Sequence, residues 1–240
     1  MALEPFLAMT AAEIREKSAL PPKIAWMACH FSPYGLGLSN LPRMLPPGSL
    51  LMLDDITPIH GHDPGIILQQ LALCAGEFQC SGILLDFQRP GIGEAAALAD
   101  ILSRGLSCPV IVSDPYARDL NCAVFLSPLA PSVPLAEHLG NWEGRQVWLD
   151  LGTAGEILTL TETGCEAIPL PFPDPYAEGF SEETLHCHYC IHTEKTSARF
   201  TLWRTRDDLT ALLTEAEQAG VLGAVGLHQE LYRILFEEQK

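Results

Sequence analysis

Short apolar segments that end on polar residues recur along this chain. Eight of them are rich in residues that favour β-strands. Their sequences are KIAWMACHF, SLLMLDD, SGILLDF, CPVIVSD, CAVFLSP, RQVWLDL, LHCHYCIH and VLGAVGLH. Most are apolar without interruption, which is typical of strands that are buried on both faces of a sheet.

Segments with helical periodicity lie between several of these strands. Residues 63–76, 93–105 and 206–220 are predicted helices, and a short helix is expected at residues 10–18, with Thr10 as N-cap and Glu13 three residues later. Strands that alternate with helices predict a parallel sheet covered on both faces. Eight such units favour a small (β/α)8 TIM-like barrel that forms a single domain over residues 1–240, and a doubly wound open sheet is the alternative.

Two regions depart from this alternation. Residues 146–170 hold three apolar runs separated by GTAGE and ETGCE, and EKTS separates LHCHYCIHT from SARFTLWRT. Such separators are typical of β-hairpins rather than of crossover helices. We therefore expect hairpins to replace some of the barrel's helices.

Composition narrows the possible partners. Apolar residues make up 48% of the chain and charged residues 18%, which predicts a folded protein with a sizeable core. The net charge of -16 disfavours nucleic acid and anionic membranes as partners. No leader or long apolar run is recognisable, so we expect a soluble, cytoplasmic protein whose cysteines are mostly reduced core residues. We expect no cofactor, because the glycines of SPYGLGLSN lack the spacing of a dinucleotide-binding loop; the oligomeric state is left open.

Polar residues at the carboxyl ends of the strands are the candidate site, because barrel enzymes carry their active sites there. The candidate catalytic residues are Asp54, Asp86, Gln88, Asp150 and Glu230, and the candidate ligand-binding residues are His30, Tyr34, Asp55, Tyr116 and His228. Trp26 and Trp148 are further aromatic residues that could stack on a ligand, although their positions within strands favour core packing.

The segment SGILLDFQ resembles the signature strand of glycoside hydrolase family 18, the chitinase-like barrels, whose pattern is Asp-Gly-x-Asp-x-Asp-x-Glu. Gly82 matches the glycine, Asp86 matches the third aspartate, and Phe87 fills the free position. Ser81 and Leu84 replace the first two aspartates, and Gln88 stands where the family has its catalytic glutamate.

The resemblance implies a TIM barrel that handles a carbohydrate or a related polar small molecule. In the family, the glutamate protonates the leaving oxygen, and the neighbouring aspartate positions the substrate's acetamido group, which is the nucleophile. An amide has no proton to give, so hydrolysis of the family type is expected to fail at Gln88. The barrel then either binds without cutting, or another carboxylate (Asp54, Asp55, Asp150 or Glu230) takes over as the acid with Asp86 as its partner.

Two other function classes stay open. In HCHYCIH, strand alternation would place His186, His188, Cys190 and His192 on one face. His186 or His188, together with Asp150 or His228 and an acid such as Asp54, would suit a metal-dependent hydrolase. No metal is assigned, because same-face neighbours along the strand lie ~6.5 to 7 Å apart and at most two of them could bind one ion. A non-catalytic barrel that binds a partner protein is the last alternative.

Overall fold

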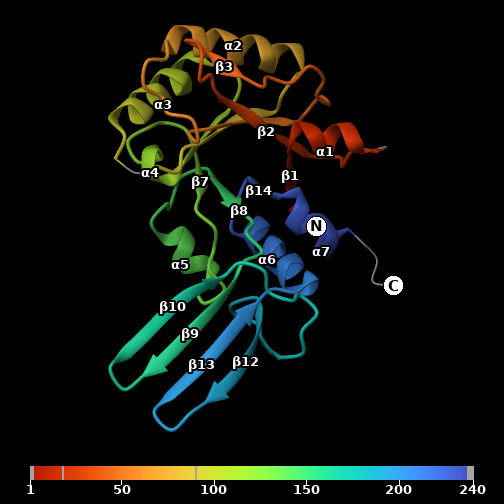
Figure 1. Ribbon diagram of the computed structural model, residues 1–240, viewed down its shortest axis with the longest axis vertical. Coiled ribbons are helices and arrows are strands. Elements are labelled where there is room, and N and C mark those ends of the chain that lie inside the picture. Colours follow the sequence, from red (N-terminus) through yellow and green to blue (C-terminus); the bar gives the residue numbers. More distant parts are fainter. Residues whose placement is uncertain (1–2, 18, 90, 237–240) are drawn as a thin grey trace.

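A closed barrel of eight parallel strands dominates the computed structural model, which describes residues 3–17, 19–89 and 91–236 (Figure 1). The order around the ring is β1, β2, β4, β5, β6, β7, β8 and β14, and β14 pairs with β1 to close it. Their bounds are Phe6–Met9, Ile24–Phe31, Leu50–Asp54, Gly82–Asp86, Val110–Ser113, Ala123–Leu126, Val147–Asp150 and Gly223–Leu227. The predicted TIM-like barrel is confirmed, and the open-sheet alternative is wrong.

One of the eight predicted strands does not belong to the barrel. LHCHYCIH forms part of a separate antiparallel sheet, and the remaining barrel strand is β1, which lies just before the predicted N-terminal helix. β1 pairs in parallel with β2 on one side and with β14 on the other. Its four residues are all buried, so a segment too short to stand out in the sequence closes the barrel.

Two apolar layers follow from the alternation of side chains along each barrel strand. On β4, Leu50 and Met52 belong to a cluster with residues of the facing strands inside the barrel, whereas Leu51 and Leu53 belong to the larger cluster that includes the helices. Trp148 packs on the inner cluster, against Phe6. A Cβ at Gly223 would collide with the Trp148 ring, so the barrel interior requires glycine there.

The predicted helices are confirmed where the structure describes them. Thr10 caps α1 (Ala11–Glu16) in a capping box with Glu13, and Ser18, the last residue of that prediction, lies outside the described residues. Asp63 caps α2 (Pro64–Glu77), and Thr205 forms a second capping box with Asp208 at the start of α6 (Arg206–Gln218). The other helices are α3 (Gly93–Gly105), α4 (Asp114–Ala117), α5 (Leu135–Gly140) and α7 (His228–Leu235). Between β2 and β4 the chain forms β3 (Leu38–Ser39), antiparallel to β2, in place of a helix.

A five-stranded antiparallel sheet is inserted between β8 and α6 and projects away from the barrel (Figure 1). Its strands are β9 (Gly155–Thr161), β10 (Gly164–Leu170), β11 (Phe180–Glu182), β12 (Cys187–Thr193) and β13 (Ser197–Trp203), in the order β10, β9, β13, β12, β11. The hairpins predicted at ETGCE and EKTS are confirmed by the β9–β10 and β12–β13 pairs. The hairpin predicted at GTAGE is wrong, because this segment connects the barrel to the inserted sheet.

Arg204 and Glu156 join the inserted sheet to the barrel. The buried guanidinium of Arg204 donates to the carbonyl oxygens of Leu129 (2.7 Å) and Ala130 (3.3 Å), which lie between β7 and α5. In the same segment, the Ser132 amide donates to Glu156 at 3.2 Å.

Within the described chain, no helix is both long and apolar enough to cross a membrane.

Candidate functional site at the barrel mouth

Three predicted site residues lie side by side at the carboxyl ends of adjacent strands. His30 on β2 pairs in register with Asp54 on β4, and Asp54 pairs in register with Asp86 on β5. The Nδ1 atom of His30 lies 2.6 Å from Oδ2 of Asp54. Burial raises the pKa of Asp54, as does the nearby Asp55, while His30 opposes this shift. His30, Asp54 and Asp86 therefore form a partly buried group of one imidazole and two carboxyl groups.

Gln88 projects at the mouth beside Asp86. Its side-chain amide donates a hydrogen bond to Asp86 Oδ1, and the Gln88 side chain is exposed. Burial raises the pKa of Asp86; the hydrogen bond from Gln88 opposes this, and the charges of Asp54 and Asp55 add to it. Gln88 is thus exposed to solvent and lies next to the carboxyl group of Asp86, its partner in the sequence pattern.

Asp55 and Tyr116 are buried supports of the loop that carries Gln88. Asp55 accepts hydrogen bonds from the backbone amides of Gln88 (3.0 Å) and Arg89 (3.1 Å). The Tyr116 hydroxyl donates to the Arg89 carbonyl and accepts from the Ile92 amide at 3.2 Å. Both were predicted ligand-binding residues, and the structure places them beneath the exposed mouth, where they hold the loop.

Asp150 and Glu230 lie on the opposite side of the ring from β4 and β5. Burial, together with the charges of Asp86 and Glu230, raises the pKa of Asp150 to about 7. Glu230 accepts hydrogen bonds from the Thr153 hydroxyl (2.7 Å) and amide (3.3 Å). No sequence pattern points to Thr153, because it lies in the GTAGE segment, for which a hairpin is predicted.

The remaining candidates lie away from this cluster. His228 is buried, and its Nδ1 lies 2.9 Å from Glu13. Burial alone would raise the pKa of Glu13, but hydrogen bonds from Thr10 and His228 outweigh it and lower the pKa.

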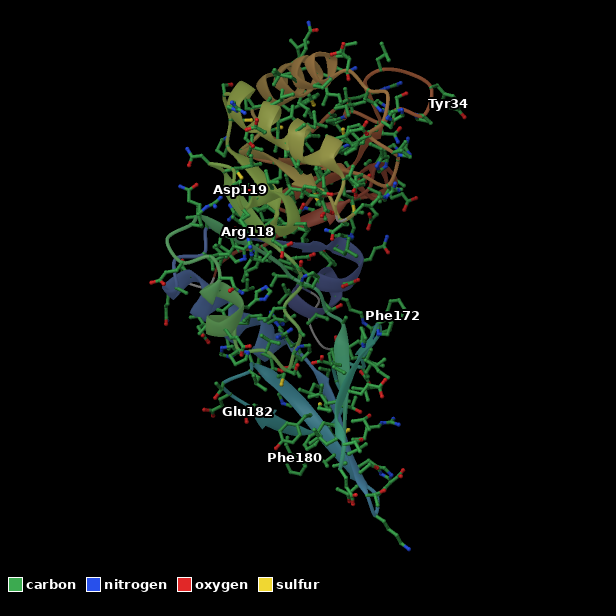
Figure 2. The ribbon with its side chains drawn as sticks, turned by 90° about the vertical axis from the view of Figure 1, so that its left-hand side faces the viewer. Tyr34, Arg118, Asp119, Phe172, Phe180 and Glu182 are labelled. Carbon is green, nitrogen blue, oxygen red and sulfur yellow. The ribbon has the colours of Figure 1, made fainter. Side chains whose placement is uncertain are left out.

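Tyr34 lies at the tip of the β2–β3 hairpin, is 97% exposed and points into solvent (Figure 2). Trp26 is buried in the outer core, where its indole nitrogen donates to the Asn40 carbonyl at 3.0 Å.

His186 and His188 contact α6 rather than the barrel mouth. His186 Nε2 lies 2.5 Å from Glu215, and His188 Nδ1 lies 2.7 Å from Asp208. His186 precedes β12 in a left-handed conformation (φ 48°), so it does not continue the strand alternation that placed it with His188. Among the residues that the structure describes, no group of three or more His, Cys, Asp or Glu side chains is placed to hold a metal ion.

Comparison with known proteins identifies relatives of the fold. No protein-family model and no curated protein matches the sequence. A double mutant of the GH18 chitinase from Cycas revoluta, solved in complex with (GlcNAc)4, matches with a TM-score of 0.58 and 11% identity, over 97% of each chain. The chitinase-like agglutinin from Robinia pseudoacacia matches with a TM-score of 0.59 and 12% identity, over 92% of this chain and 94% of that one.

A spore cortex-lytic enzyme from Bacillus cereus also shares the fold. Its TM-score is 0.57 at 9% identity, and the match covers 93% of this chain and 70% of the enzyme. The fold that the strand from Gly82 to Asp86 implied is therefore confirmed: the solved structures that match include chitinases and chitinase-like proteins.

Proposed function

We propose that this barrel is a relative of the glycoside hydrolase family 18 barrels that binds oligosaccharides of N-acetylated amino sugars at its mouth and does not cleave them through residue 88. The contact between the Gln88 amide and Asp86 carries the proposal. Asp86 offers a carboxyl group to an acetamido N–H, and Gln88 has no ionisable proton for a leaving oxygen.

The comparisons support a sugar ligand. The Cycas revoluta protein was crystallised with (GlcNAc)4, and one of its two substitutions replaces Glu with Gln. The Robinia pseudoacacia protein is named as an agglutinin that is chitinase-like. A glutamine in a chitinase-like barrel is thus compatible with a bound oligosaccharide.

Calorimetric titration with (GlcNAc)4 tests the binding, and product analysis of the same mixtures tests the cleavage. We expect the wild-type protein to bind without turnover and Gln88→Glu to bind and cleave. The control is Gln69→Glu, which adds the same charge at an exposed position of α2 and should bind without cleaving. Absence of binding by the wild-type protein would contradict the proposal, as would wild-type cleavage as fast as that of Gln88→Glu.

A second candidate function is cleavage with Asp150 as the proton donor. The raised pKa of Asp150, about 7, favours it because that carboxyl group still carries its proton at mildly acidic pH. Wild-type turnover that declines as the pH rises through 7, and that disappears in Asp150→Asn while (GlcNAc)4 still binds, is the expected result. Turnover that persists in Asp150→Asn would exclude this candidate.

A further inference from the structure

The inserted sheet has one apolar face and one polar face. Strand register places a common set of side chains on the first, which we call the apolar sheet face: Leu158, Leu160, Ala167, Phe180, Tyr189, Ile191, Ala198 and Phe200. The opposite face carries mostly polar side chains: Thr159, Thr161, Glu166, Ile168, His188, Cys190, His192, Arg199 and Thr201. A sheet with this division normally buries its apolar face against a second layer.

No second layer of the described chain covers the outer part of the apolar sheet face. Phe180 is 65% exposed, Ile191 45% and Leu160 42%. Phe180 lies on the projecting sheet, away from the barrel helices (Figure 2). The Tyr189 ring centroid lies 5.6 Å from that of Phe180 and 6.4 Å from that of Phe200, so three aromatic rings cross three neighbouring strands. Such a contiguous exposed apolar surface is typical of an interaction site.

We propose that a second copy of this chain covers the apolar sheet face, so that the two inserted sheets form a β-sandwich. A twofold pairing brings the same face of each copy together, so an uncharged apolar face is complementary to itself. In the register pairs of this face the charged residues are Glu156 and Glu182, and both lie near the barrel end of the sheet. The charge of -16 is therefore carried elsewhere, and two copies can approach here without facing carboxylates.

The size of the face is consistent with a weak dimer. Five strands spaced ~4.8 Å apart, each contributing about six residues at ~3.3 Å, cover roughly 500 Å² per copy over the whole sheet. Glu156, Cys187 and Leu202 at the barrel end of this face are buried, so two outer faces bury less than about 1,000 Å² in total, which is typical of weak, transient interfaces. The pairing is thus expected to be reversible and to depend on concentration.

Sedimentation velocity of the full chain between about 1 and 100 µM tests the proposal, since weak interfaces dissociate within this range. We expect the wild-type protein to shift from monomer to dimer as the concentration rises. Ile191→Glu should raise the dissociation constant more than about tenfold, because it buries an unpaired carboxylate in the interface. Ile168→Glu is the matched control: Ile168 is 48% exposed on the opposite face of the same sheet, and its substitution should leave the dimer intact.

Three results would overturn the proposal. They are a wild-type protein that stays monomeric at the highest concentration, a dimer that survives Ile191→Glu, and a dimer that Ile168→Glu weakens equally. Thermal unfolding of both variants checks that they are folded. A monomer that co-sediments with insoluble chitin, and loses this binding in Ile191→Glu, would assign the face to a polysaccharide instead.

Discussion

The carboxyl group of Asp150 makes the stability of the protein depend on pH. Its pKa of about 7 lies above the ~3.9 of an unperturbed Asp, so between these values the folded state holds a proton that the unfolded chain has released. The free energy of unfolding therefore falls as the pH rises from about 4 through 7. We expect Asp150→Asn to exceed the wild-type protein in stability at pH 8, on the order of 3 kcal/mol, and to match it closely at pH 4.

Urea unfolding at both pH values measures this difference. The control is Asp119→Asn, which removes one negative charge from an exposed loop (Figure 2). A stability difference for Asp150→Asn that is the same at pH 4 and pH 8 would contradict the assignment of the raised pKa to this carboxyl group.

At the scale of single residues, position along a strand predicts which candidate side chains lie together better than residue type does. Parallel strands end at one edge of the sheet, so the polar residues that follow them lie close together: His30, Asp54, Asp86 and Gln88. The position of each residue at the end of its strand can be read from the sequence. Asp55 and Tyr116 follow their strands in the same way, but whether such a side chain faces the mouth or a neighbouring loop depends on contacts with Arg89 and Ile92 from other parts of the chain. The direction of these side chains depends on tertiary contacts, so the local sequence pattern does not predict it.

At the scale of elements, Arg204 is the residue on which the attachment of the inserted sheet depends most. Arg204→Ala leaves the Leu129 and Ala130 carbonyls without this donor, and it removes a positive charge that interacts with Glu156 and Asp208. We expect a loss of about 3–5 kcal/mol in the free energy of unfolding. Arg199→Ala, at an exposed position of β13, which ends just before Arg204, should change it by less than about 0.5 kcal/mol. Urea denaturation of both variants makes the comparison, and equal effects would refute this role for Arg204.

The elements that the sequence predicted correctly are those with long periodic patterns or explicit caps. α2, α3 and α6 each have more than three turns, and Asp63 and Thr205 mark two of their starts. β1 was missed because four apolar residues are too few to show a period. The prediction that LHCHYCIH belongs to the barrel is wrong, because its alternating polar residues are typical of an antiparallel sheet with one polar face, and β12 lies in such a sheet.

At the scale of the whole molecule, β1 determines whether the ring is closed. The Leu7 amide donates to the Lys23 carbonyl at 3.0 Å, and proline there would remove this donor. We expect Leu7→Pro to lose about 3 kcal/mol or more beyond Leu7→Ala, which keeps the amide. Hydrogen exchange should then show lower protection in both β2 and β14, the strands that β1 joins. Loss confined to β1 would show that the ring holds without it.

We further propose that the barrel and the inserted sheet unfold as one unit. Arg204 and Glu156 hydrogen-bond to the segment between β7 and α5. Unfolding of the barrel should therefore also unfold the inserted sheet. Hydrogen exchange at increasing urea concentrations should give the same unfolding free energy for the most protected amides of β5 and β13. A lower value for β13 alone would divide the chain into two units.

The chain enters the inserted sheet through β9 and leaves it through β13, and these two strands pair with each other. Gly155 passes so close to the Leu202 carbonyl that a Cβ would not fit. In evolutionary terms, the entry and exit of the insertion lie at one place on the barrel, so β10, β11 and β12 can lengthen, shorten or be replaced without moving β8 or α6. Homologous chains are therefore expected to differ most in the outer strands and hairpin tips of this sheet, while the spacing between Asp150 and the mouth residues stays constant.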